Sequence, residues 1–178
     1  MIGRTHVLGG VLAAEATWSL AGSMSSQTMA LVGAAAILGS ILPDIDHPQS
    51  LIASSSLTSR VAATTVSAVT RHRGLTHTTV FVVGLSFLCW WLLARYTRLP
   101  DPQYISYGLC AGLLSHLILD SLNEKGVMWL WPISTKHISI GAIRTGSFGE
   151  TIFRIVLLAV ALLLLLGFLP SLSNLFLS

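Results

Sequence analysis

The stretch TIFRIVLLAVALLLLLGFL, from Thr151 to Leu169, decides the fold class of this chain. Arg154 is its only charged residue, and Leu162–Leu166 is an unbroken leucine run. A helix needs about 20 apolar residues to cross the roughly 30 Å hydrocarbon core of a bilayer. The stretch therefore predicts a membrane-spanning helix that faces lipid.

Other hydrophobic segments precede this one. They are His6–Ala21, Thr28–Leu42, Thr76–Tyr96 and Tyr104–Leu122. The first two are short and rich in Gly and Ala, and the last contains Gly108-x-x-x-Gly112, all of which suits close helix packing. With 53% hydrophobic and 10% charged residues, the chain is far less charged than soluble domains, where the share is roughly 25%. We predict an all-α, polytopic membrane bundle of about five hydrophobic segments that forms a single domain, 1–178.

The basic residues indicate orientation rather than nucleic-acid binding. Ten Lys and Arg are scattered between apolar segments and form no basic stripe. Five alternating spans place most of them on one side, namely Arg4, Arg60, Arg71, Arg73, Lys125, Lys136, Arg144 and Arg154, and leave Arg95 and Arg98 on the other. The positive-inside rule then predicts a bacterial inner-membrane protein whose N-terminus and two long loops are cytoplasmic.

Histidines and aspartates gather in four short motifs at the cytoplasmic ends of the expected spans. The motifs are His6, Asp44-Ile45-Asp46-His47, His72 to His77, and His116-x-x-x-Asp120. Imidazole and carboxylate together are typical ligands of Zn²⁺, Mn²⁺ and Fe²⁺, and residues spaced i, i+4 share one helix face. We predict a site for one or two divalent ions, with zinc the first choice and manganese or iron as alternatives. Its candidate ligands are His6, Asp44, Asp46, His72, His77, His116 and Asp120.

Four further polar residues have separate expected roles. Arg73 either clamps a phosphate or acts only as a topology signal, and these two interpretations stay open. His47 is a candidate base or outer hydrogen-bond partner of a ligand. Glu15 lies about nine residues beyond His6 along a helix, too far to share the site, so we expect it to form a structural hydrogen bond. His137 is expected to be a solvated loop residue.

The order and spacing of these motifs resemble a known family. His6, Leu42-Pro43-Asp44-Ile45-Asp46-His47, His72-Arg73-Gly74-Leu75-Thr76-His77 and His116-Leu117-Ile118-Leu119-Asp120 resemble the YdjM-like family of bacterial inner-membrane proteins. The resemblance covers about Met1–Pro132. It implies a membrane-bound, metal-dependent hydrolase that is distantly similar to zinc-dependent phospholipase C and the zinc single-strand nucleases. Those enzymes also use an N-terminal tryptophan and a His-x-x-x-Glu pair, which this chain lacks, so the resemblance implies two metals at most.

The function predicted from these features is hydrolysis of a phosphoester in a membrane lipid or lipid-linked substrate by metal-activated water. A metal transporter or sensor without hydrolytic activity is one alternative. A transporter is expected to hold its ligands near the bilayer midplane on broken helices, whereas these motifs gather at one edge. A metal-dependent ester or amide hydrolase is another alternative. Only the possible phosphate contact of Arg73 separates it from the predicted phosphoester hydrolase.

Overall fold

The computed structural model describes the backbone of residues 1–46, 75–99 and 101–176, and their side chains apart from residues 45–46 and 168–176. This part of the chain contains five α-helices and no named strand. The helices are α1 (Gly3–Ala21), α2 (Ser26–Ile41), α4 (Thr79–Tyr96), α5 (Pro102–Ser121) and α6 (Phe148–Phe176), and two 3-10 turns are η1 (Leu42–Asp46) and η2 (Leu75–His77). Each of the five predicted hydrophobic segments corresponds to one helix, which confirms the all-α class.

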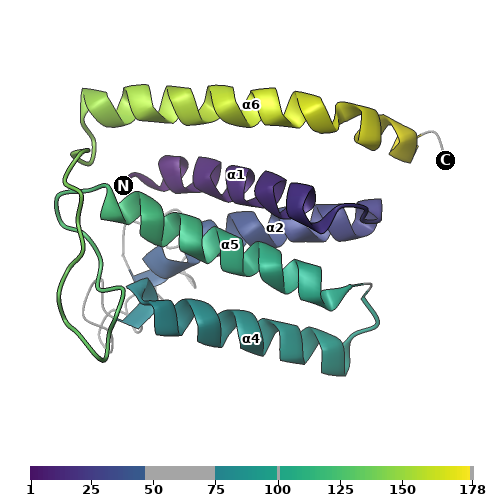
Figure 1. The fold of residues 1–178 in the computed structure, drawn as a ribbon, viewed down its shortest axis with the longest axis horizontal. Helices are drawn as coiled ribbons and strands as arrows, with labels where there is room; N and C mark the ends of the chain where they lie inside the picture. The colour runs from purple at the N-terminus through teal and green to yellow at the C-terminus, as the bar shows by residue number, and fades with distance from the viewer. Residues whose placement is uncertain (47–74, 100, 177–178) are drawn as a thin grey trace, which may run out of the picture.

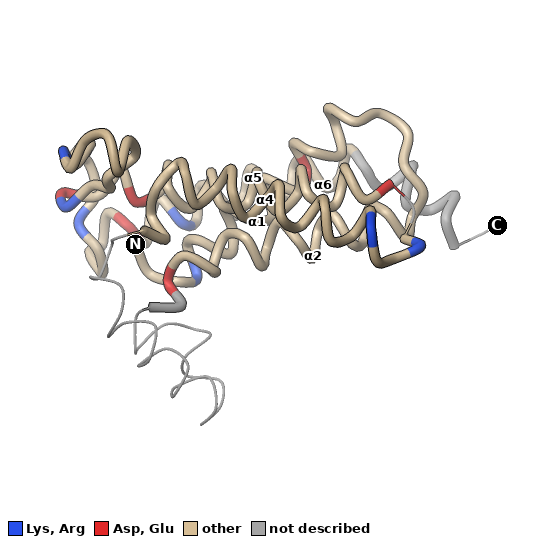
Figure 2. The backbone as a smooth tube through the Cα atoms, turned by 90° about the horizontal axis from the view of Figure 1, so that it is seen from below, with Lys and Arg blue, Asp and Glu red and all other residues tan. Residues whose placement is uncertain are grey.

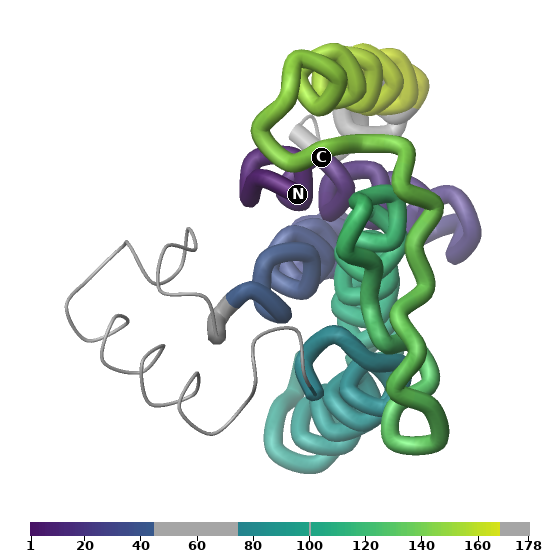
Figure 3. Tube along the Cα trace, turned by 90° about the vertical axis from the view of Figure 1, so that its left-hand side faces the viewer, coloured from purple at the N-terminus to yellow at the C-terminus, as the bar shows by residue number. Residues whose placement is uncertain are grey.

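The helices run side by side along one axis (Figure 1). At the centre, α1, α2 and α5 pack against one another. On the outside, α4 packs on α5, and α6 packs chiefly on α1. The end-on view in Figure 3 shows the same order, with α6 and α4 on opposite edges of the bundle.

Small residues allow the close approach of α5 to α2. A Cβ atom at Gly112 would clash with the backbone carbonyl of Ala36. One at Gly108 would lie 2.7 Å from the carbonyl oxygen of Val32. Helices that pack without a water-driven hydrophobic effect depend on such backbone contact. The packing role predicted for Gly108-x-x-x-Gly112 is confirmed.

Three of the helical segments are long and apolar enough to cross a membrane, whereas the sequence predicts five spans. The three are Ser26–Asp44, Thr79–Tyr96 and Phe148–Gly167. The central helices α1 and α5 have similar lengths, 19 and 20 residues, or about 30 Å at 1.5 Å per residue. Both bury polar side chains inside the bundle, such as Glu15 and His116, and these lower their hydropathy.

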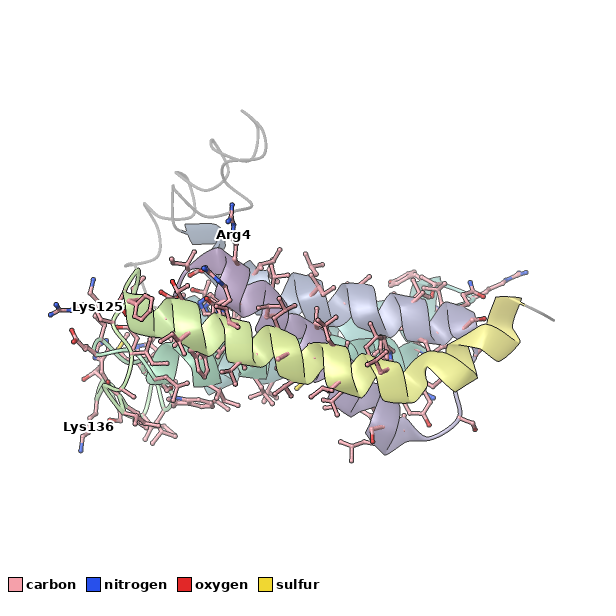
Figure 4. The ribbon with its side chains drawn as sticks, turned by 90° about the horizontal axis from the view of Figure 1, so that it is seen from above. Arg4, Lys125 and Lys136 are labelled. Atoms are coloured by element: carbon pink, nitrogen blue, oxygen red, sulfur yellow. The ribbon has the colours of Figure 1, made fainter. Side chains whose placement is uncertain are left out.

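The two ends of the bundle differ in how many basic residues they carry. Figure 2 shows blue Lys and Arg residues around the end where the N-terminus lies, and Figure 4 labels Arg4, Lys125 and Lys136 at this end. The connection between α5 and α6 covers it, held to the end of α5 by backbone hydrogen bonds from Ile140 to Ser121 (2.7 Å) and from Ile143 to Leu122 (3.0 Å). The connection between α5 and α6 is therefore held against the end of α5.

Candidate metal centre

Two turns bring polar side chains to the loop end. The 3-10 turn η1 continues α2 beyond Ile41 and carries Asp44. The turn η2 ends at His77, and Thr78 then caps α4 by accepting a hydrogen bond from the Phe81 amide (3.2 Å). Because such a cap fixes where the helix begins, it also fixes the turn that precedes it. Asp44 and His77 are thus held beside the end of α5.

Three imidazoles and two carboxylates converge there. Nε2 of His116 lies 3.2 Å from Nε2 of His77. Each of these nitrogens lies 3.7 Å from Oδ1 of Asp44. Groups from η1, η2 and α5 therefore meet around one point.

The other half of the cluster joins α1 to α5. Nε2 of His6 lies 3.3 Å from Oδ1 of Asp120, and the His6 ring stacks on that of His116 with centroids 3.9 Å apart. Oδ2 of Asp120 lies 3.9 Å from Nε2 of His77. The amino group of Met1 also contacts Oδ1 of Asp120, at 2.5 Å. Asp120 and His116 both connect the two halves.

The cluster is buried except at one residue. The side chains of His6, His77 and His116 are 0% exposed and that of Asp120 is 2% exposed, whereas Asp44 keeps 24% of its side-chain surface accessible. A molecule from outside would reach the cluster past Asp44.

Outer hydrogen bonds orient two of the imidazoles. Nδ1 of His116 lies 2.7 Å from the carbonyl oxygen of Ser40. A carbonyl only accepts, so Nδ1 carries the proton and the lone pair of Nε2 points at the cluster. Nδ1 of His77 is hydrogen-bonded to the Thr76 hydroxyl (3.0 Å), and its Nε2 also points inward. Metal-binding histidines are held by their second nitrogen in this way.

The residues fit a divalent metal. Two overlapping sets, His6–His116–Asp120 and Asp44–His77–His116, each place three ligand atoms within 4.8 Å of one another. Among the described residues, Nδ1 of His6 has no hydrogen-bond partner, and its Nε2 has only the 3.3 Å contact with Asp120. A buried imidazole is costly unless its nitrogens are satisfied, and a metal ion would satisfy the nitrogen that carries the lone pair. Because His116 has only Nε2 to offer, it can complete one of the two sets at a time.

Comparison with known proteins places the chain in a family. The family model of the YdjM inner membrane protein matches residues 1–174. This chain belongs to the YdjM family. The uncharacterized protein YvsG of Bacillus subtilis is 34% identical over 151 residues, which cover 84% of this chain and 85% of YvsG. No solved structure matches.

Two Escherichia coli proteins match shorter parts of the chain. The inner membrane protein YdjM is 34% identical over 101 residues, 54% of this chain and 47% of YdjM. The inner membrane protein YbcI is 40% identical over 68 residues, 37% of this chain and 39% of YbcI. These relatives show an inner-membrane family, and their names state no activity.

In this protein, the structure brings together five of the seven predicted metal ligands. They are His6, Asp44, His77, His116 and Asp120. The backbone of Asp46 lies in η1, but its side chain is outside the described residues. His47, His72 and Arg73 also lie outside the described residues.

Two polar residues outside the cluster test the sequence-based expectations. His137 is exposed in the loop between α5 and α6, as predicted. The structural hydrogen bond expected for Glu15 is not found among the described residues, where both of its carboxylate oxygens are buried without a partner.

Sequence reasoning missed three residues that hold the site in place. Ser40 and Thr76 orient histidines, the former through a backbone carbonyl that leaves no signature in the sequence. Glu150 accepts hydrogen bonds from the Ile2 amide (2.7 Å), the Thr5 hydroxyl (2.9 Å) and the Gly146 amide (2.6 Å). The available signal for Glu150 was an acidic residue just before a long apolar run, a common feature of a helix N-terminus.

Proposed function

We propose that this YdjM-family protein is a membrane-bound, metal-dependent hydrolase that cleaves a phosphoester of a lipid or lipid-linked substrate. The observation that carries the proposal is the buried convergence of three imidazoles and two carboxylates, each of which can offer a ligand atom to one point. Apolar helices require no such cluster to pack. Since ionisable residues inside a membrane bundle are costly, a functional role is the expected reason for such a cluster.

The proposed cofactor is one divalent ion, or two at most. Mixed histidine and aspartate ligands suit Zn²⁺ first and also Mn²⁺ or Fe²⁺. When bound, such an ion supplies Lewis acidity to a phosphoryl oxygen and activates water for attack. His6, His77, His116 and Asp120 would hold it from inside the bundle.

Asp44 has a different position from the other candidate ligands, since its side chain is partly accessible. A carboxylate at the mouth can hold the metal and also direct an incoming polar group toward the cluster. The roles proposed for Arg73, steadying phosphate oxygens, and for His47, acting as a base, rest on the sequence alone.

The position of the cluster supports hydrolysis over transport. The five groups lie at the loop end of the bundle, where lipid headgroups meet the protein, rather than half-way along the helices. A transport site is expected near the bilayer midplane. The same position suggests a substrate whose reactive bond lies at headgroup depth.

Hydrolysis by the purified protein in liposomes tests the proposal. With Zn²⁺ or Mn²⁺ present, wild type should release phosphate or a phosphorylated headgroup from at least one member of a lipid panel. Asp44→Asn should lower turnover on the order of 10²-fold, which is about 2.7 kcal/mol of transition-state stabilisation.

Asp101→Asn is the matched control. Asp101 is exposed, precedes α5 at the opposite end and has φ 48°, a conformation that Asn tolerates. It should leave hydrolysis unchanged. Metal-loaded wild type that cleaves no phosphoester, yet moves metal into sealed liposomes, would replace the hydrolase with a transporter.

A further inference from the structure

A groove runs between α1 and α6 on the outside of the bundle. It has a volume of about 320 Å³ and is lined by Arg4, Val7, Leu8, Arg154, Ile155 and Leu158. Four of these six side chains are aliphatic, and the two others carry positive charge. Both arginines belong to the part of their helix nearest the loop end (Figure 4 labels Arg4). The groove is therefore apolar along its length and cationic at its mouth.

Glu150 fixes the two walls of the groove relative to each other. Its carboxylate joins the start of α6 to the start of α1 through Ile2 and Thr5. Hydrogen bonds to a buried carboxylate are charge-assisted and strong. Elsewhere α6 packs chiefly on α1, so this clamp sets the separation of the walls.

Neither arginine is in an ion pair with a described residue. Glu150 lies one turn before Arg154 on α6, but its oxygens are taken up by Ile2, Thr5 and Gly146. Arg154 is half-buried, so its charge is less screened than that of an exposed loop residue.

We propose that this groove binds an anionic phospholipid of the membrane. Arg4 and Arg154 would hold the phosphate, since guanidinium groups bind phosphate oxygens through paired N–H donors. The aliphatic side chains would hold an acyl chain that runs between the helices. Charge complementarity selects an anionic lipid over a zwitterionic one, because the headgroup of a zwitterionic lipid would bring its own positive charge near the two arginines.

This site is separate from the metal centre. Arg4 and His6 are two residues apart on α1, and at about 100° per residue they point to nearly opposite sides of the helix. His6 faces the cluster, so Arg4 faces away from it. The bound phospholipid is thus a fixed neighbour that attaches α6 to the bundle, not the substrate of the proposed hydrolase.

The test is lipid binding by the full chain purified in a neutral detergent, with no metal or substrate required. Phosphatidylglycerol and phosphatidylcholine with identical acyl chains are added separately, and native mass spectrometry counts bound lipid while a thermal melt follows Tm. Wild type should bind phosphatidylglycerol at least tenfold more tightly and show a higher Tm with it. The double variant Arg4→Gln/Arg154→Gln should lose both the preference and the Tm increase.

Two further variants make the result specific. Arg144→Gln removes a charge from an exposed loop residue at the same end and should retain the wild-type preference. Ile155→Trp fills the groove without changing charge and should weaken phosphatidylglycerol binding. The proposal is overturned if wild type binds the two lipids equally, or if the double variant binds phosphatidylglycerol as tightly as wild type; the arginines would then be topology signals only.

Discussion

The ligand histidines differ in how firmly the protein orients them. His116 is fixed by the Ser40 carbonyl, and His77 by the Thr76 hydroxyl, so each presents Nε2 to the cluster. Nδ1 of His6 has no such partner among the described residues, and its ring is held by stacking on His116 and by the contact of Nε2 with Asp120. Of the three histidines, His6 is therefore the one without an outer hydrogen bond at Nδ1 in the described part of the chain.

Removing the Thr76 hydroxyl tests the orientation of His77. Thr76→Val keeps the shape of the side chain but leaves Nδ1 of His77 without this hydrogen bond. Loss of an outer-shell partner lowers metal affinity by about 10–100-fold, and we expect that range for zinc measured by competition with a chelator. Thr97→Val, which removes a hydroxyl bonded to the Leu93 carbonyl at the exposed far end of α4, is the control. Equal zinc affinity in both variants would show that Thr76 does not orient His77.

At the scale of elements, the polar residues of α1 and α5 explain which parts of the fold could be predicted from the sequence. The motifs predicted the convergence of His6, Asp44 and His116, because each motif lies at the end of a hydrophobic segment. Three of the five predicted spans are supported by length and hydropathy, and α1 and α5 are not among them, since hydropathy counts a buried Glu15 or Asp120 like an exposed one. The outer hydrogen bonds were not predictable, because they depend on how far η1 and η2 turn inward.

The contact of α5 with α2 gives a prediction about packing. Gly112→Ala should destabilise the bundle, because its Cβ would meet the Ala36 backbone, which cannot move as a side chain can. Overpacking of this kind costs about 1–3 kcal/mol. Gly84→Ala in α4 is the control, since no atom lies within 4 Å of its added Cβ. We expect a lower Tm in detergent for Gly112→Ala only, and equal Tm values would contradict this packing.

For the whole molecule, the unequal number of Lys and Arg residues at its two ends gives an orientation. By the bounds of the helices, the loop end carries Arg4, Lys125, Lys136, Arg144 and Arg154, and the other end carries Arg95 and Arg98. By the positive-inside rule, we propose that the loop end and the metal centre face the cytoplasm. The fold would be the same if the loop end faced the periplasm, so the orientation has to be tested separately from the fold.

Topology reporters decide the orientation. A reporter inserted beside Lys136, in the exposed loop between α5 and α6, should behave as cytoplasmic, and one fused after Ser178 as periplasmic. The control is the same pair of insertions in a variant with Lys125, Lys136 and Arg144 changed to Gln, which should weaken the preference. A periplasmic signal at Lys136 in the wild-type background would reverse the proposed orientation.

The metal content of the purified protein tests the central claim most directly. Wild type and two histidine variants are purified in detergent, checked for a single folded species, and analysed for zinc, manganese and iron. His137→Ala is the matched control, since His137 is exposed in the loop, whereas His116 belongs to both candidate ligand sets. The account predicts one or two divalent ions per chain in wild type and in His137→Ala, and loss of at least one ion from folded His116→Ala. A wild type that binds no divalent metal even after incubation with zinc, or a His116→Ala that retains the full wild-type content, would contradict it.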